Sequence, residues 1–258
     1  MSEGSSESKT PILVFGDSHT NALRRAHALR SAPRNAHIRV VRSSFVKNGK
    51  EVGEMSAEAA GSMVAESIAD TVVASAIGGN QHQSFGLVQH PVAFDFIEPG
   101  SPSSWDSAQR TLIPYRAIWS TFEKGLRGRD GQRLTALREK AARPIYHLSP
   151  PPPKESAEHI LKRYESDFEK AGLAVKGVTP ALIRLKIWRL QCAVLKSLCM
   201  EWDIRLLPPP DDTQTPEGFL KPEYYADDAS HANPGYGELV LQQLETIARA
   251  HAPVGGVA

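Results

Sequence analysis

The sequence predicts an α/β protein in which helices cover both faces of a mostly parallel sheet. Short apolar runs alternate along the chain with longer segments whose apolar residues recur at helical spacing. Each apolar run stops at glycine, proline or a polar turn, as strands buried on both faces do. The chain has 258 residues, 41% of them hydrophobic and 23% charged, which is typical of a soluble globular protein.

Five apolar runs are expected to be strands. The third of them, TVVASAI, is rich in β-branched residues and stops at Gly78 and Gly79. The fourth and fifth each run into a series of prolines, which cannot continue a sheet ladder. The five expected strands are residues 11–15, 38–41, 71–77, 144–148 and 204–207.

Helices are expected between and after these strands. The first ends before Pro33, because proline does not continue a helix. In the helix expected over 179–202, Arg184 and other basic residues are predicted to face solvent, with Leu182 and other apolar residues facing the core. The remaining helical segments are 57–69, pieces of 107–142, 155–171 and 233–251.

Residues 10–251 are expected to form one domain, with disordered tails at 1–9 and 252–258. The segment 81–122 interrupts the alternation and is rich in aromatic residues. A long insertion of this kind is either a lid or substrate wall, or a satellite hydrophobic cluster under a long loop. The sequence leaves both alternatives open.

The charge balance and the longest apolar runs exclude several partners. Thirty Lys and Arg against 29 Asp and Glu produce no field that would favour nucleic acid. No apolar run approaches the ~18 residues that a membrane span needs. The start of the chain is polar and acidic, unlike a secretory signal, so a cytoplasmic location is expected.

Cofactors and metals are not expected. Cys192 and Cys199 lie seven residues apart on a predicted helix, about 10 Å at 1.5 Å per residue, which is too far for a disulfide. They are expected to be free thiols, and no histidine spacing completes a zinc site with them. Asp211 and Asp212 have no histidine cluster beside them, and no glycine-rich phosphate loop is present.

Reactive side chains follow three of the predicted strands. Ser18 follows the first strand, Asn80 follows the third, and His231 lies beyond the fifth, with Asp228 three residues before it. Ligands of open parallel sheets bind at this edge, beyond the carboxyl ends of the strands. A serine hydroxyl becomes nucleophilic when a base takes its proton, and the base works best when a third group orients it. Ser18, His231 and Asp228 fit these three roles.

Two details of this group come from spacing and from helix termini. Asp227 competes with Asp228 as partner of His231, but a separation of three residues favours Asp228. Asn80 could donate its side-chain N–H to a developing oxyanion, and Ser18 stands at the start of a helix whose free N–H groups favour negative charge.

Three blocks of the sequence resemble the SGNH/GDSL hydrolase superfamily. They are Phe-Gly-Asp-Ser-His-Thr near the start, Gly-Gly-Asn in the middle and Asp-Ala-Ser-His-Ala-Asn-Pro-Gly-Tyr-Gly near the end, in that order. The segment PIYHLSPPPP is similar to a common feature of that family's fourth strand. The resemblance implies a flavodoxin-like three-layer α/β/α sandwich that cleaves or transfers acyl groups through a serine ester.

By position, the resemblance implies that Ser18 is the nucleophile, His231 the base and Asp228 its orienting acid. It implies an oxyanion hole made of the Ser18 backbone N–H, the Asn80 side chain and a glycine after the second strand. No glycine follows that strand directly, and Gly53, just ahead of the second helix, is the candidate.

Three further residues are candidates for substrate binding, namely His19, Gln81 and His82. Gln81 stands where the family usually has aspartate, so the hydrogen bonds that orient Asn80 must differ from the family pattern. A capping role for His19 is the ordinary alternative, and Asp17 is expected to satisfy backbone donors around its turn.

The predicted function is a serine ester hydrolase that removes a small acyl group, with acetyl on a carbohydrate as the first guess. Its partner would be a small-molecule acyl ester, without nucleic acid or membrane. An O-acyltransferase with the same residues and a non-catalytic ligand-binding module on the same fold are the alternatives. If His231 is the base, activity should rise through a pKa near 6.5, the unperturbed value of imidazole.

Overall fold

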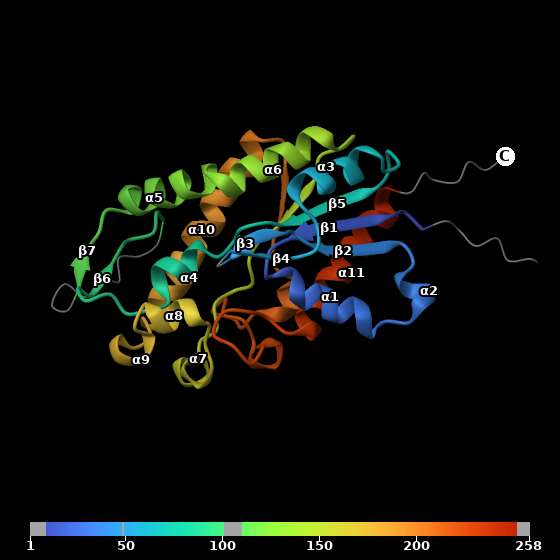
Figure 1. Ribbon diagram of the computed structural model, residues 1–258. Coiled ribbons are helices and arrows are strands. Elements are labelled where there is room, and N and C mark those ends of the chain that lie inside the picture. The colour runs from blue at the N-terminus through green and yellow to red at the C-terminus, as the bar shows by residue number, and fades with distance from the viewer. Residues whose placement is uncertain (1–8, 48, 101–109, 252–258) are drawn as a thin grey trace, which may run out of the picture.

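The computed structural model describes residues 9–47, 49–100 and 110–251 (Figure 1). Most of the two predicted tails therefore lies outside the described residues. The same holds for Trp105, in the predicted insertion, and for the first residues of the predicted 107–142 helices.

Five parallel strands form the central sheet, in the order β2-β1-β5-β8-β9. Each of the five predicted apolar runs overlaps one of them, to within one residue at the carboxyl ends of β1 and β2. Every pairing in this sheet is parallel, so the predicted sheet is confirmed. The three central strands β1, β5 and β8 are mostly buried because both faces of the sheet are covered, whereas the edge strand β9 is partly exposed. The strands are β1 (Ile12–Gly16), β2 (Ile38–Arg42), β5 (Val72–Ala76), β8 (Tyr146–Leu148) and β9 (Arg205–Leu207).

Helices lie on both faces of the sheet, which confirms the three-layer arrangement (Figure 1). One layer consists of α1 (Thr20–Leu29) and α11 (Pro234–His251), whose apolar side chains pack on one face of β1. The other layer contains α3 (Ala57–Ala65) and α6 (Arg129–Lys140), which pack against Phe15 on the opposite face. Alternate residues of β1 thus belong to two different hydrophobic clusters, as the two-residue period of a strand requires.

The described part of the aromatic-rich segment is a hydrophobic cluster. Buried Phe94, Phe96 and Phe122 pack on Ile183 and Ile187 of the long helix α10. Between a lid and a satellite hydrophobic cluster, the packing of these side chains matches the satellite cluster. Its elements are α4 (Gln81–Gly86), β6 (Phe94–Asp95), β7 (Thr111–Leu112) and α5 (Tyr115–Arg127), and α10 spans Ala181–Glu201.

The helix predicted over 155–171 is wrong, because the segment is divided into short helices. The backbone of Arg163 is extended, with φ −156° and ψ 127°, and this ends the first helix. Glu165 and Gly172 then precede two further short helices, and Gly172 adopts φ +86°, a left-handed conformation that glycine accepts readily. The predicted segment holds α7 (Ala157–Lys162) and α8 (Ser166–Lys170), and α9 (Leu173–Lys176) follows it.

The predicted solvent face of α10 is also partly wrong. Arg184 is only 4% exposed, whereas Leu182 is 65% exposed. The Arg184 guanidinium is buried because it donates to three backbone carbonyls, those of Lys154, Glu155 and Thr179. A buried charge of this kind is tolerated when hydrogen bonds satisfy its donors. Cys192 and Cys199 on the same helix are free thiols, as predicted.

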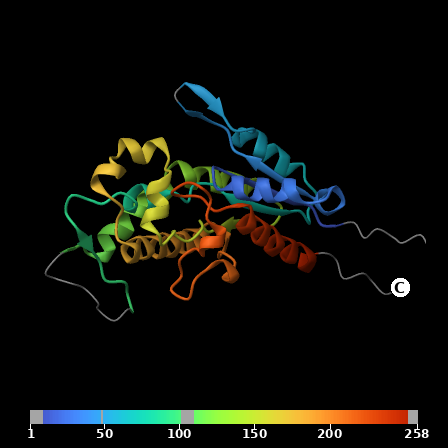
Figure 2. The ribbon, with the colours of Figure 1, turned by 90° about the horizontal axis from the view of Figure 1, so that it is seen from below.

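Several short elements were not predicted. Antiparallel strands β3 (Phe45–Lys47) and β4 (Lys50–Val52) form a hairpin that projects from the rest of the molecule in Figure 2, where it is light blue. The short helix α2 (Ala32–Asn35) contains Pro33 in its first turn, a position that proline tolerates. None of the helices in the described ranges has both the length and the apolar character needed to cross a lipid bilayer.

Candidate active site

Ser18 lies in the tight turn between β1 and α1, and Asp17 anchors this turn. The carboxylate of Asp17 accepts hydrogen bonds from the backbone N–H of Gly78 at 2.8 Å and from both terminal nitrogens of Arg133 at 2.8 and 3.1 Å. Burial raises the pKa of Asp17, but Arg133 and the Gly78 N–H outweigh burial and hold it below its usual value. Asp17 therefore joins the turn that carries Ser18 to the loop after β5.

Asn80 ends that loop and precedes α4, with its side chain exposed. One turn further on, the Gln83 amide nitrogen donates to the backbone carbonyl of Ser230 at 2.9 Å. The start of α4 is thereby tied to the loop that carries His231, although the two are far apart in the sequence.

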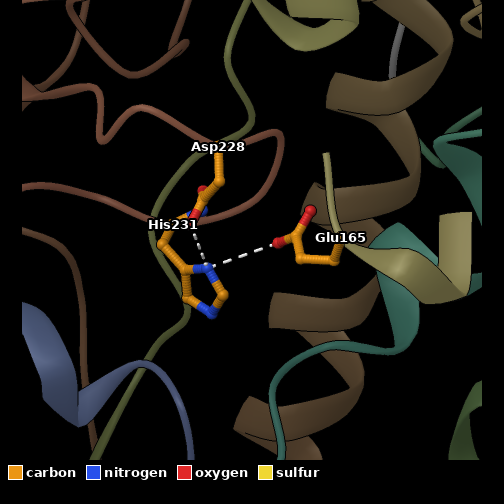
Figure 3. A group of neighbouring side chains, drawn as sticks. All are labelled: Glu165, Asp228 and His231. Carbon is orange, nitrogen blue, oxygen red and sulfur yellow. Dashed lines mark hydrogen bonds and ion pairs between the residues drawn. The ribbon is translucent and has the colours of Figure 1, made fainter. Parts of the chain in front are cut away.

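Asp228 and His231 form the contact that their spacing predicts. Oδ2 of Asp228 lies 2.8 Å from Nδ1 of His231, and Oδ1 accepts the backbone N–H groups of His231 at 2.8 Å and Ser230 at 3.1 Å. Asp227 is exposed and is not the partner. Oε1 of Glu165 lies 3.3 Å from the same Nδ1, while Nε2 points away from both carboxylates (Figure 3).

His19 completes the connection between the loops. Its ring centroid lies 5.3 Å from that of His231, with the two rings inclined at 55°. Ser18 directly precedes His19, so the serine belongs to the turn that contacts the imidazole. Three independent contacts, Asp17 to Gly78, Gln83 to Ser230 and His19 to His231, bring the three sequence blocks together at the carboxyl edge of the sheet.

The electrostatics of the site differ from those of a free imidazole. Burial of the His231 ring lowers its pKa, but Asp228 and Glu165 outweigh burial and raise the pKa to about 9. Burial raises the pKa of Asp228, yet its contacts with His231 hold that pKa far below its usual value. Burial and the nearby His231 lower the pKa of His19 to about 3, so His19 is neutral. The expected value of 6.5 for His231 is therefore replaced by a value near 9.

Two of the predicted substrate-binding side chains are engaged elsewhere. Nδ1 of His82 lies 3.2 Å from the Gln191 amide oxygen on α10, and the His82 ring is buried. The Gln81 amide faces α5, where it can donate to the Phe122 carbonyl at 3.2 Å and accept from the Leu126 N–H at 3.3 Å. The structure does not bring these two side chains to His231.

Gly53 lies beside the end of β2, after the projecting hairpin. Its φ of +112° and the backbone of Ser43 against it both require glycine, since a Cβ there would lie 2.3 Å from the Ser43 carbonyl oxygen. Ser43 in turn donates its N–H to the carbonyl of Gly16 at 2.7 Å. Gly53 is thus near Gly16, the last residue of β1, which stands two residues before Ser18 in the chain.

Two residues at the site were not singled out from the sequence. Lys154, only 3% exposed, donates to the backbone carbonyls of Ala226, at 2.6 Å, and Asp228, and so fixes the loop before His231. Burial lowers the pKa of Lys154 to about 8. Glu165 lies in the segment that was predicted to be helix. The only sequence feature that marks Lys154 is its place after four prolines. No sequence feature marks Glu165.

Glu165, Asp228 and His231 are also close enough to hold a metal ion. Their ligand atoms lie within 4.8 Å of one another. The Asp228 carboxylate already accepts the backbone N–H groups of Ser230 and His231 and lies beside Nδ1 of the His231 ring. This is the arrangement expected of a base and the acid that orients it. We therefore interpret the three residues as a histidine held by two carboxylates and not as a metal site.

A small cavity opens beside His19 at this edge of the sheet. Its volume of about 20 Å³ is little more than one water molecule needs. The wall is mostly apolar and includes Leu23, Ala76, Leu148, Tyr236 and Val240, together with Gly78 and Gly79.

Comparison with solved structures yields nearly full-length matches at low identity. A carbohydrate acetylesterase from Sinorhizobium meliloti is 11% identical, with a TM-score of 0.44 over 95% of this chain and 99% of that one. An extracellular lipase from Streptomyces rimosus is 13% identical, with a TM-score of 0.46 over 93% and 99% of the two chains. The aryl esterase of M. smegmatis is 13% identical, with a TM-score of 0.44 over 93% and 99%.

No protein-family model and no curated protein matches the chain. The solved structures matched here, an acetylesterase, a lipase and an aryl esterase, are thus similar to this chain over nearly its whole length.

Proposed function

We propose that the protein is a serine ester hydrolase, with Ser18 as nucleophile and His231 as base. The observation that carries the proposal is the meeting of the three loops, in which a histidine oriented by Asp228 contacts the turn that holds Ser18. Nε2 of His231 takes part in no hydrogen bond within the described ranges, which leaves it available to a hydroxyl or a leaving group.

In the proposed first half-reaction, the Ser18 oxygen forms a bond with the acyl carbon while Nε2 of His231 takes the hydroxyl proton. The tetrahedral intermediate collapses, the bond to the alcohol oxygen breaks, and His231 returns the proton to that oxygen. Water then attacks the acyl-serine in the same way and releases the acid. Asp228 stabilises the imidazolium formed in both half-reactions.

The negative oxygen of the intermediate needs donors that are already in place. We assign the backbone N–H groups of Ser18 and Gly53 and the side chain of Asn80 to this role. Their loops surround the carboxyl end of β1, and the Asn80 side chain is accessible. A single oxyanion donor typically contributes about 2.7–4 kcal/mol to transition-state stabilisation.

We propose a short acyl group, with acetyl as the first candidate, because the cavity beside His19 is small and apolar. The alcohol half of the ester is proposed to be a carbohydrate on the resemblance of the first motif alone.

The test is hydrolysis of p-nitrophenyl acetate, butyrate and octanoate by the full chain at pH 9. We expect kcat/KM for the acetate to exceed that for the octanoate by roughly tenfold or more, because the cavity has no room for the longer chain and forcing extra methylenes into a packed site costs about 1–3 kcal/mol. Faster hydrolysis of octanoate would overturn the short-acyl proposal, and no turnover of any of the three would overturn the hydrolase proposal. Adding a sugar acceptor and identifying the products separates hydrolysis from acyl transfer.

A further inference from the structure

His231 has two carboxylate partners. Its Nδ1 lies 2.8 Å from Asp228 and 3.3 Å from Glu165, and the two carboxylates approach from different sides (Figure 3). Asp228 comes from the loop of His231 itself, whereas Glu165 comes from the break between α7 and α8, 66 residues earlier in the chain.

Glu165 is held in this position. The Ser230 hydroxyl donates to Oε1 of Glu165 and also lies 3.1 Å from Nδ1 of His231. The Glu165 side chain is 29% exposed and that of His231 is 21% exposed, so water screens their interaction only in part. The contacts of Ser230 hold Glu165 and His231 together.

The other charged and titratable groups around His231 do not substitute for Glu165. His19, from the turn after β1, is neutral because its pKa is lowered to about 3. Lys154, from the segment after β8, has its Nζ 3.9 Å from Oδ1 of Asp228 and balances part of that charge. Glu165 is therefore the second negative charge that acts directly on the ring.

We propose that Glu165 is a positioning residue for His231, acting with Asp228 to hold the ring and to stabilise its protonated form. A single Nδ1–H points mainly to the nearer Asp228, so the main contribution of Glu165 is electrostatic. An opposite charge at this distance favours the charged form of a titratable group, by about 1–3 pH units in proteins. The proposal deepens the proposed function, on which its kinetic test rests.

The kinetic test compares the pH dependence of kcat/KM for p-nitrophenyl acetate in the wild-type protein and Glu165→Gln. The wild-type rate is expected to rise up to a pKa of about 9, since His231 acts as a base only when neutral. In Glu165→Gln the rise is expected about one pH unit lower. The variant should therefore be roughly tenfold faster than wild type at pH 7, and equal or a few-fold slower at pH 10.

Two control variants separate charge from structure. Glu165→Asp keeps the charge and should retain a rise close to that of wild type. Glu169→Gln removes an exposed glutamate from α8, the short helix that Glu165 precedes, and should change nothing. A purely structural role for Glu165 predicts a uniform loss of activity at every pH with an unchanged profile, and that result would overturn the proposal.

An NMR titration of the His231 ring tests the same inference without any turnover. His231→Ala identifies the resonance, and the ring pKa is measured in the wild-type protein, in Glu165→Gln and in Glu165→Met as a second uncharged variant. We expect a pKa about one unit lower in both variants. Equal pKa values in folded proteins would refute the role of Glu165. A lowered pKa in a protein without esterase activity would refute the proposed function and leave this inference standing.

Discussion

Replacing Ser18 with alanine is expected to lower kcat for p-nitrophenyl acetate by about 10⁴-fold or more, because no other hydroxyl would form the acyl-enzyme. The KM of the variant should change much less, since the apolar cavity and the proposed oxyanion donors do not depend on the hydroxyl. Steady-state kinetics at pH 9, where His231 is about half neutral, measure both parameters.

Ser84→Ala is the matched control for this prediction. Ser84 is an exposed serine on α4, at the same edge of the sheet and one turn from Asn80. Its loss should leave kcat within about twofold of wild type, as for most exposed substitutions away from special features. A Ser18→Ala variant that retains turnover similar to that of Ser84→Ala would remove Ser18 from the mechanism.

Arg133→Ala is expected to lower the free energy of unfolding by about 2–4 kcal/mol, because it leaves the Asp17 carboxylate partly buried without its main partner. The side chains of Arg133 and Asp17 are 13% and 23% exposed, so solvent replaces the guanidinium poorly. Urea unfolding at pH 7 measures the loss. Arg129→Ala, which removes an exposed arginine from the same helix, should cost less than about 0.5 kcal/mol.

The pH dependence of this loss follows from Asp17. Its pKa in the folded protein is below the usual value of 3.8, so the pair stabilises the fold above that pH and ceases to do so as the pH falls through the folded pKa. The difference in unfolding free energy between wild type and Arg133→Ala should therefore be constant from pH 5 to 8 and shrink below pH 4. A difference that stays the same at pH 3 would show that the Arg133 effect is not electrostatic.

The sheet and the order of its layers follow from the sequence because buried parallel strands have a strong local signature. The run TVVASAI, closed by two glycines, contains β5, and the runs before Pro150 and Pro208 contain β8 and β9. The contact of Asp228 with His231 is likewise local, since a separation of three residues on one short loop can form it.

Features that depend on distant parts of the chain could not be predicted. Glu165 lies in a segment with good helical pattern, in which the extended backbone of Arg163 ends the helix. The contact that holds Glu165 beside the ring comes from Ser230, a residue far away in the sequence. Arg184 has the pattern of a solvent-facing residue. Its burial depends on free carbonyls after β8 that the pattern of α10 does not reveal.

The central claim is that Ser18 carries a hydroxyl activated by His231, and covalent labelling tests it most directly. The full chain is incubated with a fluorophosphonate at pH 9, and the adduct is located by mass spectrometry of the intact protein and its peptides. We expect one adduct, on Ser18, with slower labelling in His231→Ala and none in Ser18→Ala. No adduct on wild-type protein, or an adduct on another residue that persists in Ser18→Ala, would contradict it.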